Sequence, residues 1–402
     1  MKPTIIIGAG HAGLSLAREI RALDKAMPIT ILSQDPIQAY YKPNLSKALS
    51  MKKSAEQLIM KQLNVLKRDL DAELLEHTSV FKLNSKKKNI LCQAKDSDNK
   101  TQEPFELSYS NLILATGASP IQLPINGASD NVVSVNTLQD YAQFRDMIKN
   151  KKKILIIGAG FVGCEFASDL SNNGYQVDVI DRANWPLEQV IPEQLGTAIK
   201  HAISKNSVNW HFQSTIDEIV KDKQGRLKTH LSNGSIILTD LIISAVGLSP
   251  NIQLATDSGL LTAKGIVVDE YSRTSLPAIY ALGDCVEYDG QPLPFIAPAT
   301  LAAKALAKTL TGNKIKRVFP PQPVSIKIAN CPTLLCPPKS KEGSWQVSGD
   351  GQDLEVAFYN NKKEMVGFAL SGEKVSLKGE YLSRYSTSKI SQGVQPQASA
   401  IN

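Results

Sequence analysis

Two glycine-rich segments of the same pattern lie far apart in this chain of 402 residues. The first, Gly8–Gly13, reads GAGHAG, and the second, Gly158–Gly163, reads GAGFVG. A short aliphatic run precedes each of them, at Thr4–Ile7 and Ile154–Ile157. In such a segment the first glycine permits a sharp strand-to-helix turn, the second lets the backbone approach a pyrophosphate, and the third lets the helix pack on the strand. The sequence therefore predicts two Rossmann-type units that hold two dinucleotides.

The segments on either side of the turns agree with this prediction. The aliphatic runs read as strands buried on both faces of a parallel sheet. The helical patterns after the turns each have one apolar face, formed by Leu14, Leu16, Ala17 and Ile20 in the first unit and by Phe166, Ala167 and Leu170 in the second. A helix N-terminus at the turn offers free N–H groups and a partial positive charge to phosphates. Two plain strand-to-helix turns without a ligand are the alternative interpretation.

Composition agrees with a globular enzyme of two or three domains, with 42% hydrophobic and 21% charged residues. No apolar stretch is long enough to span a bilayer, and no signal-peptide apolar region follows Met1, so we expect a cytoplasmic protein. The net charge of +7 is spread along the chain. The chain has two compact lysine runs, Lys86–Lys88 and Lys151–Lys153, and neither has the neighbouring aromatic residues that are typical of a nucleic-acid-binding surface. A basic surface would instead favour an acidic protein partner.

The second unit carries an acidic residue where a dinucleotide ribose is expected. The predicted strand Gln176–Ile180 is followed directly by Asp181. A carboxylate at this point accepts hydrogen bonds from the ribose hydroxyls and repels a 2′-phosphate, which favours NADH over NADPH. Arg182 comes next and could tolerate a phosphate, so both nicotinamide cofactors stay open.

The first unit has no carboxylate at the matching position. Its second strand, predicted over Ile29–Leu32, is followed by Ser33 and Gln34, and then by Asp35. Ser33 or Gln34 could hydrogen-bond the adenosine part of the nucleotide, or Asp35 could reach it. The argument for a pyrophosphate at the first glycine turn does not depend on this choice.

Three further segments indicate which nucleotide the first unit holds. A predicted strand in Asn111–Gly117 ends in Ala-Thr-Gly, and Leu241–Gly247 is its counterpart in the second unit. The segment Thr274–Asp284 ends in Gly-Asp, which places the Asp284 carboxylate where the end of a strand meets a bound ligand. This carboxylate can accept a hydrogen bond from a ribityl hydroxyl, and Gly283 leaves room for the isoalloxazine chain. The first nucleotide is therefore expected to be FAD.

With these motifs the chain resembles the pyridine-nucleotide–disulfide oxidoreductases, flavoproteins with two dinucleotide-binding domains, over residues 1 to about 320. Within that family it is similar to the rubredoxin–NAD reductases. The segments that carry this closer resemblance are Tyr41–Ser46, Gly163–Leu170, Ala245–Leu248, Ile279–Glu287, Val324–Lys327 and Cys331-Pro332.

The order of the motifs implies an α/β fold with a split first domain. Residues 1–117 and 248–320 are expected to form an FAD-binding domain, and residues 118–247 an inserted NAD-binding domain. Residues 321–382 are expected to form a small α/β domain, followed by a polar tail, 383–402, with little fixed structure. The strands expected in the C-terminal domain are Val324–Ile328, Trp345–Val347, Leu354–Phe358 and Met365–Leu370.

The cysteines bear on where electrons go after the flavin. In the family that this chain resembles, disulfide reductases carry a redox cysteine pair, or a single cysteine, near the flavin. The corresponding segment here is Tyr40–Ser46, and it contains no cysteine. Electrons must then leave the flavin directly, to a redox protein or a diffusible oxidant. Cys331 and Cys336 could form a redox pair, but a structural role is favoured for them and for Cys164 and Cys285.

The resemblance also implies several contacts to the flavin. Lys42 would reach the ring near N5, and Glu165 would point at the flavin and pair with Lys42. Lys327 would join the flavin shell from the C-terminal domain, and Ile296 would contribute a backbone contact at a helix start. Val80 maps to an adenine-side contact or to a plain core position.

The resemblance implies a reductase that passes electrons from NADH through FAD singly to rubredoxin, feeding an alkane hydroxylase or similar oxidase. No catalytic acid, base or nucleophile and no metal is expected. A reductase of flavorubredoxin or ferredoxin is the alternative, and an NADH-binding flavin redox sensor is the alternative of another class. The expected cofactor-binding residues are Ile7, Gly8, Ala9, Gly10, His11, Ala12, Gly13, Ser33, Gln34, Lys42, Val80, Thr116, Gly117, Gly158, Gly160, Gly163, Glu165, Asp181, Gly247, Gly283, Asp284, Ile296 and Lys327.

Overall fold

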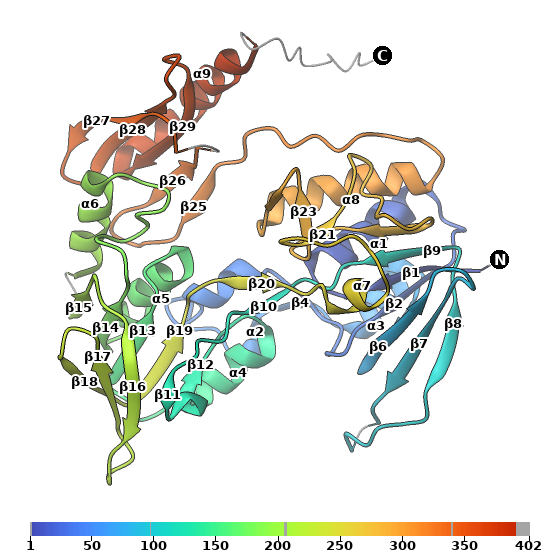
Figure 1. Cartoon of the computed structure of the whole chain (residues 1–402), viewed down its shortest axis with the longest axis horizontal. Coiled ribbons are helices and arrows are strands. Elements are labelled where there is room, and N and C mark those ends of the chain that lie inside the picture. The colour runs from blue at the N-terminus through green and yellow to red at the C-terminus, as the bar shows by residue number, and fades with distance from the viewer. Residues whose placement is uncertain (1, 97, 205–206, 339–340, 391–402) are drawn as a thin grey trace. The chain divides into compact units, whose positions relative to one another are not determined.

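The protein is described by a computed structural model that covers residues 2–96, 98–204, 207–338 and 341–390 (Figure 1). The chain divides into two compact units. The first contains Met1–Lys42, Ala55–Ile121 and Leu248–Pro320, and the second contains Pro43–Ser54, Gln122–Gly247 and Pro321–Asn402. Within the described part of the chain, no helix combines the length and apolarity needed to cross a membrane.

The first unit is built on a parallel five-stranded sheet of order β22-β9-β1-β2-β5. Its strands are β1 (Thr4–Ile7), β2 (Ile29–Leu32), β5 (Glu73–Leu75), β9 (Asn111–Leu114) and β22 (Ile279–Ala281). Every residue of β1 and β2 is buried, as the aliphatic runs predicted. Ile7 lies opposite Leu32 and Leu114, so the carboxyl ends of three strands meet at one edge. The first glycine turn begins at this edge.

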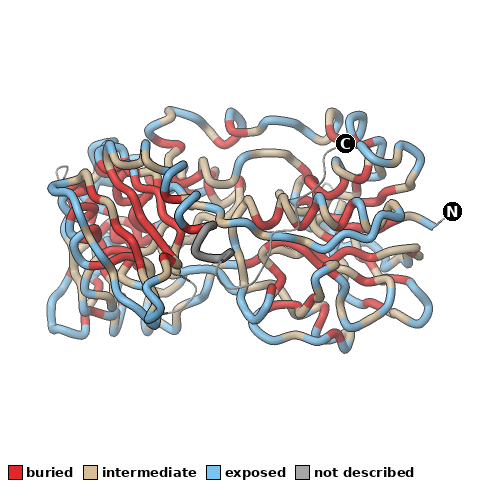
Figure 2. The backbone as a smooth tube through the Cα atoms, turned by 90° about the horizontal axis from the view of Figure 1, so that it is seen from above, coloured by how far each residue is buried: buried red, intermediate tan, exposed pale blue. Residues whose placement is uncertain are grey.

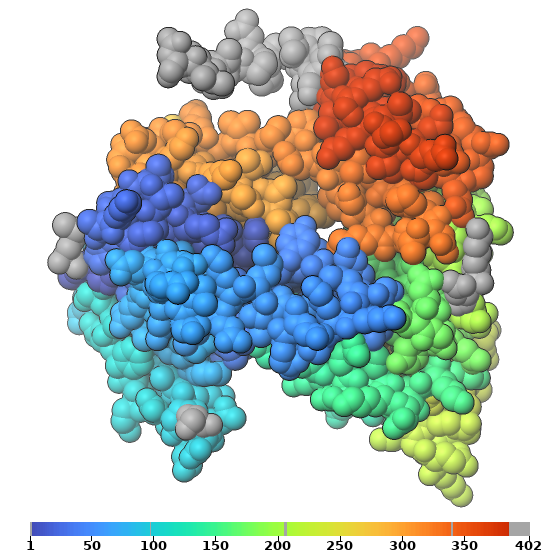
Figure 3. All heavy atoms as spheres, turned by 180° about the vertical axis from the view of Figure 1, so that it is seen from behind, coloured from blue at the N-terminus to red at the C-terminus, as the bar shows by residue number. Residues whose placement is uncertain are grey.

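Two helices pack side by side over this sheet, as Figure 1 shows: α1 (His11–Leu23) and α8 (Ile296–Leu310). The predicted apolar face of α1 is buried. The other helices of the unit are α2 (Ala55–Leu58), α3 (Leu63–Leu70) and α7 (Gln253–Asp257). An antiparallel sheet of β6 (Thr78–Asn84), β7 (Asn89–Ala94) and β8 (Phe105–Ser108) forms the cyan projection of this unit in Figure 3.

Short strand pairs complete the first unit. Its small sheets are β3 (Ala39–Tyr40) with β4 (Ile59–Lys61), β10 (Ala118–Pro120) with β20 (Leu248–Pro250), and β21 (Ile266–Val267) with β23 (Val286–Tyr288) and β24 (Gln291–Pro292). The β10–β20 pair joins the two points where the chain leaves and re-enters the unit.

The second unit repeats the parallel design with the sheet order β12-β19-β13-β14-β15. These strands are β12 (Val132–Val133), β13 (Lys153–Ile157), β14 (Gln176–Ile180), β15 (Val208–His211) and β19 (Leu241–Ser244), and the helices are α4 (Leu138–Met147), α5 (Phe161–Asn172) and α6 (Glu193–Ser204). A further sheet contains β11 (Asn126–Gly127), β16 (Ile216–Lys221), β17 (Leu227–Leu231) and β18 (Ile236–Thr239). Figure 2 marks the buried strand segments of the sheets in red.

The C-terminal part of the second unit is an antiparallel sheet of order β25-β26-β29-β28-β27. Its strands are β25 (Val324–Ile326), β26 (Thr333–Cys336), β27 (Ser344–Asp350), β28 (Asp353–Tyr359) and β29 (Met365–Ser371). The sequence did not predict β26, and it placed Lys327 inside a strand that ends one residue earlier. The helix α9 (Lys378–Ile390) packs on β29. The expectation of little fixed structure from Ser383 onward is therefore wrong as far as Ile390, and residues 391–402 lie outside the described residues.

Residues 43–54 belong to the second unit, whereas the sequence assigned them to the first domain. The contacts give the physical reason. The buried carboxylate of Asp169 on α5 accepts the backbone N–H groups of Leu49 and Ser50, at 3.1 and 2.9 Å. Side-chain to backbone hydrogen bonds between distant segments leave no pattern in the sequence.

Candidate functional site

The first glycine turn has the steric form that a pyrophosphate site needs. Gly8 has φ +113°, and a Cβ there would collide with the carbonyl oxygen of Ala115 at the end of the neighbouring strand. A Cβ on Gly13 would collide with the backbone of Gly8, while one on Gly10 would meet nothing within 4 Å. Gly10 is the N-cap of α1 and supplies no side chain to cap it. Open space in front of uncapped N–H groups fits a phosphate.

The second glycine turn repeats this geometry. A Cβ on Gly163 would collide with the carbonyl oxygen of Gly158, and Gly160 faces open space at the uncapped start of α5. Asp181 follows β14, and its two carboxylate oxygens accept the N–H groups of Ala159 at 2.6 Å and Ala183 at 2.8 Å. These bonds fix the carboxylate beside the turn, which is where a dinucleotide ribose is bound in this type of fold.

The Gly-Asp motif of the first unit lies among three other predicted site residues. Burial raises the pKa of Asp284, and the charges of Lys42 and His11 oppose that shift. Burial lowers the pKa of His11. The His11 ring nitrogen Nε2 lies 2.9 Å from Thr300 Oγ1, which donates to the carbonyl of Ile296 at the start of α8. Lys42, His11, Asp284 and Ile296 therefore belong to one region of the first unit.

The strand ends beside this region are fixed by polar contacts. Thr116 Oγ1 donates to the backbone carbonyl of Asn251 at 2.8 Å, and the Asn251 amide donates to the carbonyl of Thr116 at 2.8 Å. Asn251 N–H donates to the Gly117 carbonyl. This reciprocal pairing holds the Ala-Thr-Gly turn against the returning chain. The sequence did not single out Asn251.

In the second unit, Glu165 is a buried carboxylate with partners from two distant segments. Ser46 Oγ donates to Glu165 Oε2 at 2.5 Å, and the backbone N–H of Lys327 donates to Oε1 at 2.9 Å. Lys327 Nζ lies 3.8 Å from Oε2 and also donates to the carbonyl of Pro43. Burial lowers the pKa of Lys327, and the Glu165 carboxylate opposes that shift. The structure therefore brings Glu165 and Lys327 together, and the pairing of Glu165 with Lys42 stays a prediction.

Among Glu165, Lys327 and Ser46, only Ser46 was given no role from the sequence. It is the last residue of the Tyr41–Ser46 motif. It belongs to a 3-10 helix, Lys42–Lys47, and its side chain is buried. A small hydroxyl in a buried position near a predicted site was the signal available.

For Ser33, Gln34, Val80 and Gly247, the described contacts do not test the predicted binding roles, which stay predictions. Ser33 and Gln34 follow β2, and Ser33 Oγ accepts the N–H of Asp35 at 3.2 Å. Val80 lies on β6, half-buried against the core of the first unit. Gly247 has φ +109° just after β19.

All five cysteines are buried, and none of them forms a disulfide. Burial raises the pKa values of Cys164 and Cys285. Cys164 Sγ donates to the carbonyl of Ala159, and Cys285 Sγ lies near the carbonyls of Leu114 and Leu282. Buried thiols of this kind pack as small apolar groups, in agreement with the structural role expected for them.

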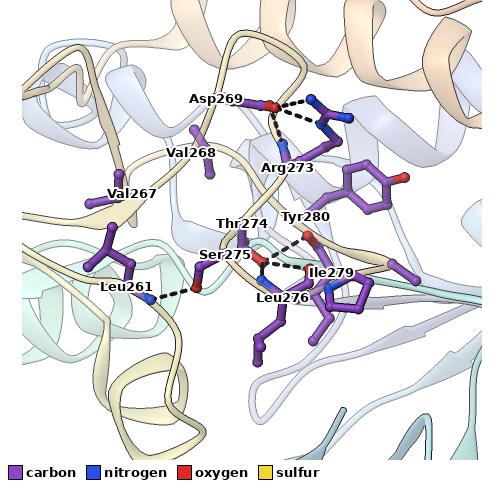
Figure 4. Close-up of a pocket in the computed structure, with 12 residues that line it drawn as sticks. Leu261, Val267, Val268, Asp269, Arg273, Thr274, Ser275, Leu276, Ile279 and Tyr280 are labelled. Carbon is purple, nitrogen blue, oxygen red and sulfur yellow. Dashed lines mark hydrogen bonds and ion pairs between the residues drawn. The ribbon is translucent and has the colours of Figure 1, made fainter. Parts of the chain in front are cut away.

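A pocket in the first unit lies apart from these residues (Figure 4). Its lining is Leu261, Val267, Val268, Asp269, Arg273, Thr274, Ser275, Leu276, Pro277, Ala278, Ile279 and Tyr280, none of which is a predicted cofactor-binding residue. The figure shows Asp269 joined to Arg273 and Ser275 joined to the backbone of Leu261, so these polar groups of the pocket are paired with one another. The glycine turns, unlike this pocket, combine uncapped helix starts with open space at the backbone, so they stay the predicted cofactor sites.

Comparison with known proteins decides the family. Residues 2–306 match the family described as Pyridine nucleotide-disulphide oxidoreductase. The chain belongs to this family. Residues 317–384 of this family member also match the Rubredoxin binding C-terminal domain, which includes β25 to β29 and most of α9.

Curated and solved relatives agree. A protein of Alcanivorax borkumensis named Rubredoxin-NAD(+) reductase is 37% identical over 94% of this chain and 97% of its own length. A protein of Aeromonas hydrophila named Nitric oxide reductase FlRd-NAD(+) reductase is 32% identical over 92% and 93%. The solved ferredoxin reductase from Rhodopseudomonas palustris has a TM-score of 0.82 and 25% identity over 92% of this chain and 91% of its own.

These findings confirm the predicted α/β fold class, the family and the class of enzyme, an oxidoreductase. They also confirm FAD and NAD(H) as cofactors, in agreement with the family match and with the relative named Rubredoxin-NAD(+) reductase. The predicted partner class, a rubredoxin-type protein, is confirmed by the C-terminal match. Most of the residues predicted to bind FAD lie in the first unit, whereas Glu165, Lys327 and Asp181 lie in the second.

Proposed function

We propose that this oxidoreductase transfers electrons from NADH through FAD, one at a time, to rubredoxin. The match of residues 317–384 to a rubredoxin binding domain carries the proposal. The absence of cysteine from Tyr40–Ser46 supports direct delivery from the flavin, since no internal dithiol is available in that segment to accept the electrons first.

We further propose roles for the residues that form the two sites. Gly8–Gly13 and the start of α1 hold the FAD pyrophosphate, and Asp284 accepts a hydrogen bond from the ribityl chain. Gly158–Gly163 and Asp181 hold NADH. When bound, FAD accepts a hydride and returns single electrons. Lys42 supplies positive charge beside the flavin.

Glu165 and Lys327 act as a positioning pair in this proposal. Their hydrogen bond and ion pair fix the end of β25 against α5, with Ser46 on the same carboxylate. This arrangement holds the ammonium of Lys327 in a defined place, and the Glu165 carboxylate favours its charged form against the effect of burial. A fixed charge stabilises a reacting centre better than a mobile one.

We propose residues 1–117 and 248–320 as the FAD-binding domain, apart from 43–54, which lie in the second unit. We propose 118–247 as the NAD-binding domain, and 321–382 together with the rest of α9 as the acceptor domain. We also propose that the protein works in the cytoplasm and that its rubredoxin feeds an alkane hydroxylase or a similar oxidase. The relatives named as flavorubredoxin reductases favour one alternative acceptor, the rubredoxin-like part of a flavorubredoxin.

Steady-state NADH consumption separates these acceptors. We expect rapid turnover with purified rubredoxin, slower turnover with flavorubredoxin and little with ferredoxin. Preference for ferredoxin would contradict the proposal. Absence of turnover with every acceptor would favour a redox sensor instead.

A further inference from the structure

The hydroxyl of Tyr288 is tied to the Gly-Asp motif of the first unit. The backbone N–H of Gly283 donates to Tyr288 Oη at 3.3 Å, and both groups are buried. The chain closes a tight turn between them, in which the N–H of Val286 donates to the Gly283 carbonyl at 3.1 Å. Asp284 lies inside this turn, so the Tyr288 hydroxyl acts on the backbone that carries the Asp284 carboxylate.

Gly283 has little freedom to move without losing this geometry. Its φ is +87°, and a Cβ there would lie 2.7 Å from the Cβ of Ala12, at the start of α1. The peptide therefore lies close against the first turn of α1, the helix that begins at the FAD pyrophosphate turn. A small rotation of this peptide would change the direction of the Asp284 side chain.

The ring of Tyr288 is itself held by two residues of the segment that leads out of the first unit. The guanidinium carbon of Arg317 lies 4.7 Å from the centre of the Tyr288 ring, a cation–π contact. The ring of Phe319 meets the same ring edge-on, with centroids 5.0 Å apart. Tyr288 is only 3% exposed as a result.

The Arg317 side chain is anchored as well. Its side chain is 4% exposed, it donates to the backbone carbonyl of Asp269, and its own N–H donates to the carbonyl of Glu270 at 2.8 Å. Buried arginines need such partners because an unpaired buried charge is costly. The segment with Arg317 and Phe319 is thus fixed on the first unit although it contains no helix or strand.

We propose that Tyr288 is a positioning residue for FAD, and that Arg317 and Phe319 hold its ring in place. Tyr288 acts through the Gly283 N–H, which sets the direction of the Asp284 carboxylate toward the ribityl chain. This proposal rests on the proposed role of Asp284. It assigns to the start of the rubredoxin binding match, at residue 317, a function in retaining the flavin of the first unit.

The variant Tyr288→Phe tests the proposal because it removes one hydroxyl and keeps the ring. The Gly283 N–H then loses its hydrogen-bond partner in the buried turn. Opening the turn to water would satisfy this N–H, and FAD leaves more easily from the open turn. We expect FAD to dissociate from the holoenzyme up to about fivefold faster, the value of one ordinary hydrogen bond. We also expect a change in the visible circular dichroism of bound FAD, which a general loss of stability would not produce.

Tyr280→Phe is the matched control. Tyr280 lies on β22 in the same unit, where Figure 4 shows it at the pocket. This variant removes a tyrosine hydroxyl without touching Gly283, so the FAD release rate and the dichroism spectrum should equal those of the unchanged protein. Arg317→Met should accelerate FAD release as Tyr288→Phe does, and Arg317→Lys should restore part of the loss because it keeps a cation near the ring.

A third variant separates this inference from the proposed function. Asp284→Ala should release FAD faster than both the unchanged protein and Tyr288→Phe, since it removes the contact to the ribityl chain itself. If Asp284→Ala accelerates release and Tyr288→Phe leaves the rate and the spectrum unchanged, the positioning role is wrong and the proposed cofactor site stands. If neither variant has an effect, both the positioning role and the role of Asp284 are wrong.

Discussion

The carboxylate of Glu165 accepts the backbone N–H of Lys327 at 2.9 Å and lies 3.8 Å from the ammonium of the same residue. Glu165 is on the helix that follows the second glycine turn, and Lys327 comes directly after β25 of the rubredoxin binding match. One side chain thus connects the helix after the second glycine turn with the C-terminal sheet of the same unit. This relationship makes Glu165 the most informative residue to change.

Glu165→Gln should weaken the second unit and slow the reaction. The amide keeps the shape but loses the ion pair with Lys327, so we expect the free energy of unfolding to fall by about 1.5–3 kcal/mol, as for hydrogen bonds to charged groups. Flavin reduction by NADH should slow, measured by stopped-flow bleaching of the flavin. The exposed Glu193 on α6 offers a control, and Glu193→Gln should change neither quantity. Equal behaviour of the two variants would contradict the positioning role.

Lys42→Ala should slow flavin reduction or loosen FAD. Its charge acts on the partly buried Asp284, and we propose that it also stabilises negative charge on the reduced ring. Stopped-flow rates and the FAD content of the purified protein give both readouts. Lys82→Ala, on the exposed face of β6, is the control. An unchanged hydride-transfer rate together with full FAD content would rule out this role for Lys42.

Asp181→Ala should raise the KM for NADH by about tenfold or more, the usual cost of losing hydrogen bonds to a charged group. It should also narrow the preference for NADH over NADPH, since the carboxylate no longer repels a 2′-phosphate. Steady-state kinetics with both cofactors measure this. Faster turnover of the unchanged protein with NADPH would overturn the cofactor preference.

Asp284→Asn should stabilise the FAD-free protein at neutral pH. Burial raises the folded-state pKa of Asp284 above its ordinary value of 3.8, so its contribution favours the folded state below 3.8 and is lost as pH rises through the raised pKa. At neutral pH the charged group therefore costs stability that the amide does not. Denaturant unfolding as a function of pH should show the gain shrinking as pH falls toward 3.8. A gain independent of pH would contradict this explanation.

Replacing both Cys331 and Cys336 by serine should leave NADH-dependent reduction of rubredoxin unchanged. Both thiols are buried and free, and Cys336 lies within β26. Burial raises the pKa of Cys331, which disfavours the reactive thiolate. Loss of rubredoxin reduction with normal flavin reduction would show instead that the pair carries electrons.

The parts of this fold that could be predicted are those that the local sequence determines. The strands at Thr4–Ile7 and Gln176–Ile180 have the predicted bounds, because short aliphatic runs before fixed turns leave little choice. The strand Thr333–Cys336 was not predicted. It is short, and Pro332 and Pro337 lie directly before and after it, so the segment has the sequence pattern of a loop.

The contacts that build the site were harder to predict. Glu165 was expected to face the flavin, but Ser46 and the backbone of Lys327 as its partners depend on segments far apart in the chain. The same holds for Asp169, which fixes residues 43–54 to the second unit, and for Tyr288, which resembles an ordinary core residue. Sequence patterns identify the glycine turns but not the tertiary hydrogen bonds between distant segments.

The central claim is tested most directly by mixing the NADH-reduced protein with oxidised rubredoxin in the absence of oxygen. Stopped-flow absorbance should show the flavin reoxidised as two rubredoxin molecules are reduced for each NADH consumed, with the same stoichiometry in the serine variant of Cys331 and Cys336. A flavin that stays reduced in the presence of rubredoxin, or that reacts faster with ferredoxin, would contradict the account.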